Sequence, residues 1–353
     1  MKDLVLLGAG QAHVQLLSTL AAKPLAGVQV TLIAPYPLQL YWGMVPGFVA
    51  GHYARDDCTI ALEPLLKKAG VRWLSHGTEA LDANARTVRL IDGSTFGFDW
   101  LCLNPGPLQD RQQIELVLPG AREHGLFVRP LEAFGALWPR VMELGTERAL
   151  RVAVLGSGAT GVELAMAIRQ RLHTSSVTLV CGGPQVAANY PAEVQQRLIK
   201  ALKQRAITLL PDLAVGIEAG QVLLGSGARL ACDVPVIATG AQPPAWLGDS
   251  GLTLDPQGFV ALDAFQRSVS HPHVLAAGNV PTRADRTLAQ NLYALLSGSK
   301  TLHPTPAVNT LHLLSCGDRR AIANWGRFSA QGRWVWWLKD WLDRGYIRRY
   351  RKI

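Results

Sequence analysis

The chain has 353 residues, 48% of them hydrophobic and 17% charged, a composition that excludes disorder of the chain as a whole. At about 150 residues per domain, the length predicts two or three structural units. The net charge is +9, but residues 319–353 hold ten basic and two acidic residues, so the rest of the chain is nearly neutral.

The chain opens with a pattern typical of a βαβ unit. An apolar run at 4–7 precedes the turn Gly8-Ala9-Gly10, apolar residues at helical spacing follow, and a β-branched run covers 28–33. This order predicts a parallel sheet. The uncharged stretches 4–22 and 24–54 are not predicted to span a membrane, because polar residues interrupt the first and prolines the second.

The same pattern returns at mid-chain. A strand at 151–155, the motif Gly156-x-Gly158-x-x-Gly161, a helix at 162–172 and a strand at 177–180 predict a second βαβ unit. Glycines in this context favour binding of a dinucleotide pyrophosphate over a purely structural turn. The segments 87–91 and 100–103, with a turn at Asp92-Gly93, predict a β-meander inserted between the two units.

The later segments complete the predicted organisation. Strands are predicted at 234–238 and 273–277, the second one returning to the first sheet. The expected fold is α/β, with two Rossmann-like dinucleotide-binding domains, a β-meander insertion and a C-terminal helical tail. We place the FAD-binding domain at 1–107 and 245–318, the NAD(P)-binding-like domain at 108–244, and a basic, tryptophan-rich tail at 319–353.

Neither glycine turn is followed by the carboxylate that binds ribose hydroxyls at the end of the second strand. Cys181 stands there in the second unit and Ala34 in the first. The second site is therefore expected to bind NAD(P)H weakly, with little discrimination between NADH and NADPH. The five cysteines include no closely spaced pair, which argues against a disulfide redox centre, a sulfide-oxidising site and a zinc finger. No metal site is predicted.

Several segments in order carry a resemblance to a known family: 3–14, 41–47, 51–53, 156–164, 238–240, 276–279, 317–322 and 334–350. They resemble the flavoproteins with two dinucleotide domains of the pyridine nucleotide-disulfide oxidoreductase superfamily, which include type II NADH dehydrogenases and sulfide:quinone reductases. The flavoprotein module fused ahead of selenophosphate synthetase is similar as well. The resemblance spans nearly the whole chain.

The resemblance implies that FAD binds at the first glycine turn. From the residues alone, His13 is favoured as a packed or capping residue, and Met44 fits core packing equally well. The positions assigned to FAD are Gly8, Gly10, Gln11 and His13 at the phosphates, Gly43, Met44 and Pro46 along the flavin ring, Asn104 and Gly106 in a turn that replaces an Ala-Thr-Gly-like turn, and Gly278 with Asn279 near the ribityl chain.

The resemblance also implies that NAD(P)H faces the second glycine turn. Glu163 follows this turn, where type II NADH dehydrogenases have a glutamate near the contact between nicotinamide and flavin. It is the predicted catalytic residue, although a glutamate in a first helical turn also suits the helix dipole. The positions assigned to the nucleotide are Gly156, Gly158, Thr160, Gly161 and Gly240.

Two departures from the family concern the flavin. The family usually has an aspartate where this chain has Asn279. Only a few residues then precede a helix expected near Arg286, whereas the family inserts there a segment that covers the flavin and forms the quinone edge.

The final 35 residues are predicted to be helical. Tryptophan with flanking arginine suits the surface of an anionic bilayer, although docking on the protein's own body or a homodimer contact stays open. Nucleic acid is not expected as a partner, because no recognition fold accompanies the basic residues. The face in question comprises Trp334, Trp337, Leu338, Trp341 and Leu342.

Two functions are consistent with these patterns. The first is an FAD-dependent oxidoreductase that passes electrons from NAD(P)H to a quinone or similar acceptor, cytoplasmic and attached to the inner membrane face through 333–353. The second is a degenerate flavoprotein scaffold that binds a nucleotide or partner without turnover. The absent ribose carboxylates and Asn279 favour the scaffold, and retention of the second glycine motif with Glu163 favours the enzyme.

Overall fold

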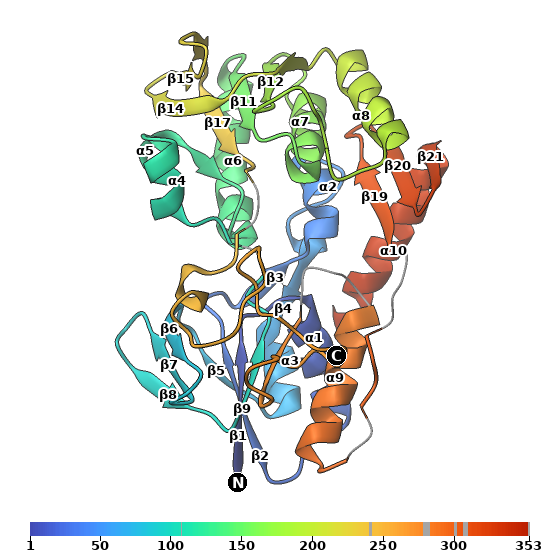
Figure 1. Ribbon diagram of the computed structural model, residues 1–353. Helices are drawn as coiled ribbons and strands as arrows, with labels where there is room; N and C mark the ends of the chain where they lie inside the picture. Colours follow the sequence, from blue (N-terminus) through green and yellow to red (C-terminus); the bar gives the residue numbers. More distant parts are fainter. Residues whose placement is uncertain (107, 240–241, 278–282, 300–301, 306–309, 352–353) are drawn as a thin grey trace.

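A computed structural model describes residues 1–106, 108–239, 242–277, 283–299, 302–305 and 310–351, with the backbone alone for 283–286. The cofactor positions predicted at Gly240, Gly278 and Asn279 lie outside these residues. Figure 1 shows two domains end to end, with the C-terminal elements along one side of both.

The first domain is built on a five-stranded parallel sheet in the order β18-β9-β1-β2-β5. The apolar end of β1 is fully buried, as expected for a central parallel strand. Helix α1 packs against α3 and α9. The elements are β1 (Lys2–Leu7), α1 (Gln11–Ala22), β2 (Val28–Ile33), β3 (Leu38–Leu40), η1 (Trp42–Met44), α2 (Val45–Val49), η2 (Asp56–Cys58), β4 (Thr59–Ala61), α3 (Leu62–Ala69), β5 (Arg72–Leu74), β9 (Trp100–Leu103), β18 (Val274–Ala276) and α9 (Arg283–Leu296).

The β-meander differs from the prediction in its strands. It comprises β6 (Thr78–Asp82), β7 (Thr87–Leu90) and β8 (Thr95–Gly97), with Gly93 at φ +83° in the predicted turn. The predicted meander strand at 100–103 is instead β9, which lies between β1 and β18 in the parallel sheet. The continuous apolar run of β9 explains the difference, because it suits a strand buried on both faces rather than an exposed meander.

The second domain repeats the architecture, with parallel strands in the order β10-β17-β11-β12-β13. The predicted fold of two Rossmann-like domains is therefore confirmed. Asp110 caps α4 by accepting the amides of Gln112 and Gln113. The elements are α4 (Arg111–Val117), α5 (Ala121–His124), β10 (Leu126–Phe127), α6 (Leu131–Glu147), β11 (Arg151–Leu155), α7 (Ala159–Arg171), β12 (Ser176–Val180), α8 (Ala192–Gln204), β13 (Thr208–Leu210), the antiparallel β14 (Ala214–Glu218), β15 (Gln221–Leu224) and β16 (Arg229–Ala231), then β17 (Val234–Ile237) and η3 (Ala245–Leu247).

The C-terminal region is only partly helical, which corrects the prediction of a helical tail from 319 onward. Three antiparallel strands, β19 (Leu311–Ser315), β20 (Ala321–Trp325) and β21 (Phe328–Gly332), precede α10 (Arg333–Arg351). The apolar residues Ala321 and Ile322 at the start of β20 are buried, and Gly326, at φ +58°, allows the tight turn of the hairpin. Strand β19 packs on α7 and β20 on α8, while α10 reaches β4 and η1 of the first domain.

Helix α10 has one face docked on the protein and the opposite face exposed. Its buried side chains include an ion pair between Lys339 and Asp343, in which Nζ lies 2.6 Å from Oδ2. Lys339 also donates to the carbonyl of Gly43, and the hydroxyl of Tyr41 donates to Asp343. One of the alternatives left open for the tail, docking of its helix on the rest of the protein, is therefore seen in the structure. Among the described residues, no helix has the length and apolar character needed to cross a bilayer.

Candidate cofactor sites

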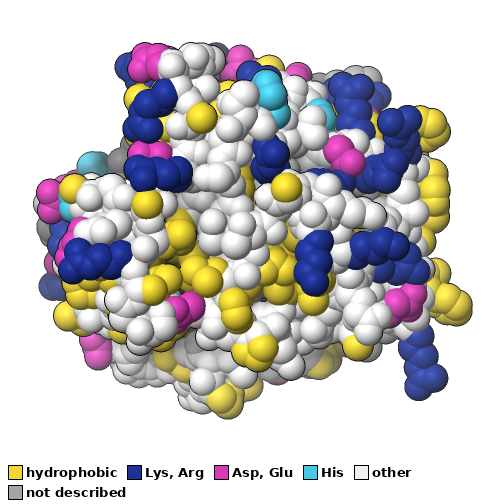
Figure 2. Space-filling view, turned by 90° about the horizontal axis from the view of Figure 1, so that it is seen from above, with side chains coloured by type: hydrophobic (Ala, Val, Ile, Leu, Met, Phe, Trp, Pro, Cys, Tyr) yellow, Lys and Arg dark blue, Asp and Glu magenta, His cyan; other side chains and the backbone are white. Residues whose placement is uncertain are grey.

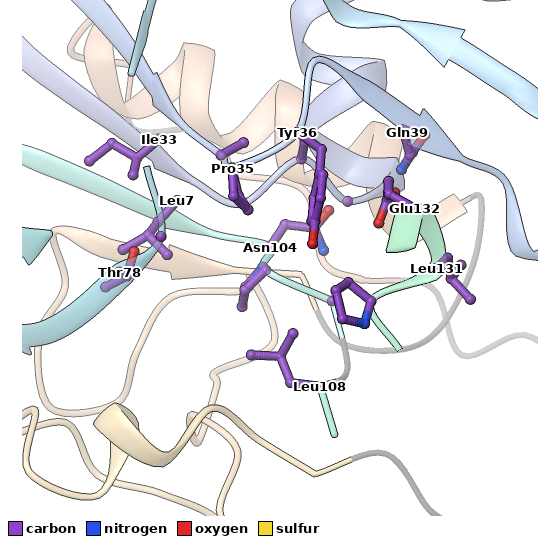
Figure 3. Close-up of a pocket in the computed structure, with 18 of the residues that line it drawn as sticks. Leu7, Ile33, Pro35, Tyr36, Gln39, Thr78, Asn104, Leu108, Leu131 and Glu132 are labelled. Carbon is purple, nitrogen blue, oxygen red and sulfur yellow. The ribbon is translucent and has the colours of Figure 1, made fainter. Parts of the chain in front are cut away.

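The first cavity, of about 630 Å³, lies at the carboxyl ends of β1 and β2. This is the edge of a parallel sheet at which nucleotides bind, and the volume is within the usual range for ligand pockets. Figure 3 shows Leu7, Ile33 and Thr78 at one end, Leu131 and Glu132 at the other, and Asn104 between them. Of the positions predicted for FAD, those that line the cavity are Gly8, Gly10, Gln11, Asn104 and Gly106.

The first glycine turn requires its glycines because β9 ends directly against it. Gly8 has φ +89°, and a Cβ there would lie 2.2 Å from the Cα of Pro105. A Cβ on Gly10 would lie 2.1 Å from Oδ1 of Asn104. That oxygen accepts the amide of Ala12 at 3.1 Å and the amide of His13 at 3.4 Å. Asn104 therefore satisfies two N-terminal amides of α1 that a phosphate could otherwise bind.

His13 supports the turn from inside the protein. Its ring is fully buried, Nδ1 lies 2.5 Å from the carbonyl oxygen of Gly8, and burial lowers the pKa of His13 to about 4. The ring is therefore neutral at physiological pH and is not among the residues that line the cavity. This placement agrees with the interpretation of His13 as a packed residue, which here supports the glycine turn.

The predicted flavin-ring positions Gly43, Met44 and Pro46 lie behind the cavity wall. Their neighbour Trp42 lines the cavity, whereas Met44 and Pro46 are buried. A Cβ on Gly43 would lie 2.6 Å from the ring of Tyr41. Contact of these three residues with a flavin thus stays a prediction. Ala34, at the end of β2, leaves the cavity without the ribose carboxylate, but the turn and the cavity fit a dinucleotide.

The second cavity, of about 610 Å³, surrounds the second glycine turn. Gly156 has φ +117° and, like Gly161, is packed tightly: a Cβ on Gly161 would lie 1.9 Å from the carbonyl oxygen of Gly156. A Cβ on Gly158 would meet open space. Gly158 is the N-cap of α7, where no side chain caps the helix, so the end of α7 fits a pyrophosphate better than the capped end of α1. Gly156, Gly158 and Thr160 line this cavity.

Cys181 lines the second cavity at the end of β12, where a ribose carboxylate would stand. We expect Cys181→Asp to strengthen NADH binding roughly tenfold or more, since a hydrogen bond to a charged group contributes about 1.5–3 kcal/mol. NADPH should bind no better, because the new carboxylate repels its 2′-phosphate. Nucleotide titrations of the wild type, Cys181→Asp and the neutral control Cys181→Ser measure this. Equal gains for both nucleotides would contradict the assignment.

Glu163 points away from the second cavity. It is buried on α7, its Oε1 accepts the amide of Ser315 in β19 at 2.7 Å, and it does not line the cavity. Burial raises the pKa of Glu163 to about 7, while the charge of Lys339 opposes this shift. Burial, followed by the charge of Glu163, raises the pKa of the nearby Tyr190 to about 12. The contacts of Glu163 join the second domain to the C-terminal strands, and its catalytic role stays a prediction.

Other cavity residues were not found from the sequence. Arg129 lines both cavities, and Gln109 lines the second. Neither belongs to a glycine motif or to a segment that carries the resemblance. Trp42 could have been found, because it lies within the resembling segment 41–47.

Comparison with known proteins identifies the family. Residues 2–296 match the family of pyridine nucleotide-disulphide oxidoreductases. The chain belongs to this family. Family membership supports the predicted cofactors, FAD and NAD(P)H, and the assignment of the chain as an oxidoreductase.

Similar proteins cover different shares of the chain. An NADH dehydrogenase-like protein of Mycobacterium tuberculosis is 27% identical over 63% of this chain, and the match spans only 58% of that relative. An NADH dehydrogenase-like protein of Bacillus subtilis is 21% identical over a match that covers 79% of this chain and 76% of that relative.

Solved structures show the same fold over nearly the whole chain. The sulfide:quinone oxidoreductase of Aquifex aeolicus has a TM-score of 0.79 at 15% identity, covering 100% of this chain and 92% of that one. NDH2 of Plasmodium falciparum, in complex with NADH, has a TM-score of 0.78 at 13% identity, covering 99% and 97%.

Proposed function

We propose that the protein is a flavin-dependent oxidoreductase that passes electrons from NAD(P)H to a quinone or a similar acceptor. The observation that carries the proposal is the arrangement of two nucleotide-sized cavities, each at a glycine turn, with Arg129 in the wall of both. A shared wall residue brings the two cavities together, as electron transfer from a nicotinamide in one to a flavin in the other requires. The flavin supplies the redox chemistry when bound.

In this scheme the residues of the chain bind FAD and NAD(P)H and orient them. The turn at Gly8 and Gly10 admits the FAD phosphates to the first cavity, and the uncapped end of α7 takes the pyrophosphate of NAD(P)H. Trp42 and Arg129 form an aromatic and cationic wall. Neutral His13 holds the carbonyl of Gly8 in place.

The direct test is whether the protein holds flavin and reduces it. Purified protein should be yellow or take up added FAD, and NADH or NADPH should bleach its flavin absorbance without air. Bleaching by both nucleotides at similar concentrations is expected, because no ribose carboxylate follows β12. Protein that neither carries nor takes up FAD would contradict the proposal.

A scaffold without turnover is the second candidate, and Asn104 favours it. Its Oδ1 already accepts two amides at the end of α1, so fewer donors remain for the FAD phosphates. If the protein is such a scaffold, it takes up FAD or nucleotide, but NAD(P)H does not bleach the flavin. The same experiment therefore separates the two functions.

The exposed face of α10 supports an acceptor at a membrane surface. Trp334, Trp337 and Trp341 are 57%, 64% and 67% exposed, and Phe328 at the neighbouring hairpin is 77% exposed. Figure 2 shows hydrophobic side chains beside Lys and Arg at the edge where β21 and α10 lie. Indoles and bases on one surface suit an anionic bilayer interface, where a quinone would be available.

We expect Trp337→Ser/Trp341→Ser to weaken binding to vesicles with anionic lipid at least tenfold, because two indoles no longer enter the interface. The double substitution Leu137→Ser/Leu144→Ser, at exposed positions on α6, is the control and should change little. Vesicle sedimentation at low and high salt measures both. Full-length protein that does not bind anionic vesicles at low salt would contradict membrane attachment. The exposed indoles would then be assigned to a contact with another protein. Point substitutions are preferable to truncation at Arg333, because the other face of α10 is buried in the protein.

A further inference from the structure

Arg129 is held between the two cavities by residues of both domains. Its backbone amide donates to Oε1 of Gln109 at 2.8 Å, and Nε2 of Gln109 donates to the carbonyl of Ile237 at 2.8 Å, at the end of β17. Its guanidinium lies over the ring of Trp42 in the first domain, 5.5 Å from the ring centroid. The backbone is thus fixed by the second domain while the side chain reaches the wall of the first cavity.

Among the residues that the structure describes, Arg129 has no carboxylate within ion-pair distance. In the described parts of the chain, no hydrogen bond or ion pair joins its guanidinium to another residue. Glu132 is the carboxylate whose charge acts on it, but Oε1 of Glu132 accepts the amide of Leu40 at 3.0 Å. Burial lowers the pKa of Arg129 to about 10, so the side chain is still a cation at neutral pH. Because Arg129 is only half-buried in the cavity wall, its donors are accessible to a ligand in the cavity that supplies acceptors.

The neighbouring polar side chain of Gln39 does not add an acceptor at this end of the first cavity. Gln39 is buried, and although other atoms of its side chain line the cavity, its Oε1 has no accessible surface and so does not face a ligand there. Figure 3 places Gln39 near Glu132, at the end of the cavity opposite Leu7 and Ile33. This end therefore offers the planar, cationic guanidinium of Arg129 beside the ring of Trp42.

The Arg129 guanidinium, at the end of the first cavity that adjoins the second, matches the carbonyl oxygens at the pyrimidine edge of a flavin, where negative charge gathers on reduction. We propose that Arg129 binds this edge and stabilises the reduced flavin over the oxidised one, which makes Arg129 a determinant of the reduction potential. The inference rests on the proposed function, in which the first cavity holds FAD. The apolar end at Leu7 and Ile33 would then receive the adenine.

The test measures the reduction potential of bound flavin by photoreduction against a reference dye, without nicotinamide. Arg129→Gln should lower the potential by about 30 mV or more, which corresponds to a tenfold loss of preference for the reduced form. Arg129→Lys should keep most of the wild-type potential. Arg111→Gln removes the same charge from an exposed residue whose charge acts on Tyr36 of the cavity, and should change little. Arg129→His provides a second variant, whose potential should fall further as the histidine loses its proton between about pH 6 and 8.

Each other outcome overturns the inference in a recognisable way. An unchanged potential in Arg129→Gln, or the same shift in Arg111→Gln, excludes a specific role for Arg129. An unchanged potential with at least tenfold weaker NADH binding would assign Arg129 to the phosphates of the nucleotide in the second cavity. Wild-type protein that takes up no FAD would overturn both this inference and the proposed function, whereas flavin uptake with an unshifted potential overturns this inference alone.

Discussion

Replacing Glu163 by glutamine should stabilise the protein at pH 8 and leave its stability at pH 5 nearly unchanged. The pKa of this buried carboxyl is raised from 4.5 to about 7, chiefly by desolvation. Between these values the folded protein binds more protons than the unfolded chain, so the free energy of unfolding falls as pH rises through this window. Above pH 7 the full penalty of burying the carboxylate is present. Glutamine removes that penalty, which amounts to about 3 kcal/mol at most, and can still accept the amide of Ser315.

Urea unfolding at both pH values measures this effect. Glu147→Gln, at an exposed position near the end of α6, is the control and should shift neither curve by more than about 0.5 kcal/mol. Glu163→Ala should be less stable than Glu163→Gln, because it leaves the buried amide of Ser315 without an acceptor. A Glu163→Gln variant that is less stable at pH 8 than the wild type would show that the ionised carboxylate stabilises the fold. Turnover measured on the same variant tests the predicted catalytic role separately from stability.

The sequence predicts the parts of the fold that local patterns determine. Glycine turns between an apolar strand and an amphipathic helix marked both βαβ units, because the positive φ of Gly8 and Gly156 is a local requirement. Burial and partners at long range were not predictable in this way. The strand at 100–103 is apolar in either arrangement, and only the whole sheet determines that it pairs with β1.

The functional residues show the same limit. Asn104 caps a helix that lies 92 positions earlier, and Glu163 accepts an amide 152 positions later. Helical periodicity correctly placed Trp334, Trp337 and Trp341 on one face of α10 but could not show which face is buried. Hydrophobicity alone favours burying the indoles, whereas the structure buries Lys339 and Asp343 and exposes Trp337. A polar pair can be buried because each member satisfies the other and finds a further partner on the first domain.

This buried pair gives the second large expected effect. Lys339→Met alone should destabilise the protein by about 3–5 kcal/mol, because the buried carboxylate of Asp343 keeps, from the described residues, just the hydroxyl of Tyr41 as a donor. It also removes the donor to the carbonyl of Gly43, which adjoins the cavity residue Trp42. Weaker FAD uptake should therefore accompany the loss of stability.

The double substitution Lys339→Met/Asp343→Leu should recover most of the stability, since two apolar side chains replace two charges without leaving either one unpaired. The exposed pair of Arg140 and Glu143 is the matched control: Arg140→Met should change the free energy of unfolding by no more than about 1 kcal/mol. Denaturant unfolding of the four proteins forms the comparison. A double variant as unstable as Lys339→Met would show that the contacts of the pair with Tyr41 and Gly43, rather than its charge balance, hold α10 on the first domain. Equal stability of Lys339→Met and wild type would instead show that the buried contacts of α10 add little to the stability of the fold.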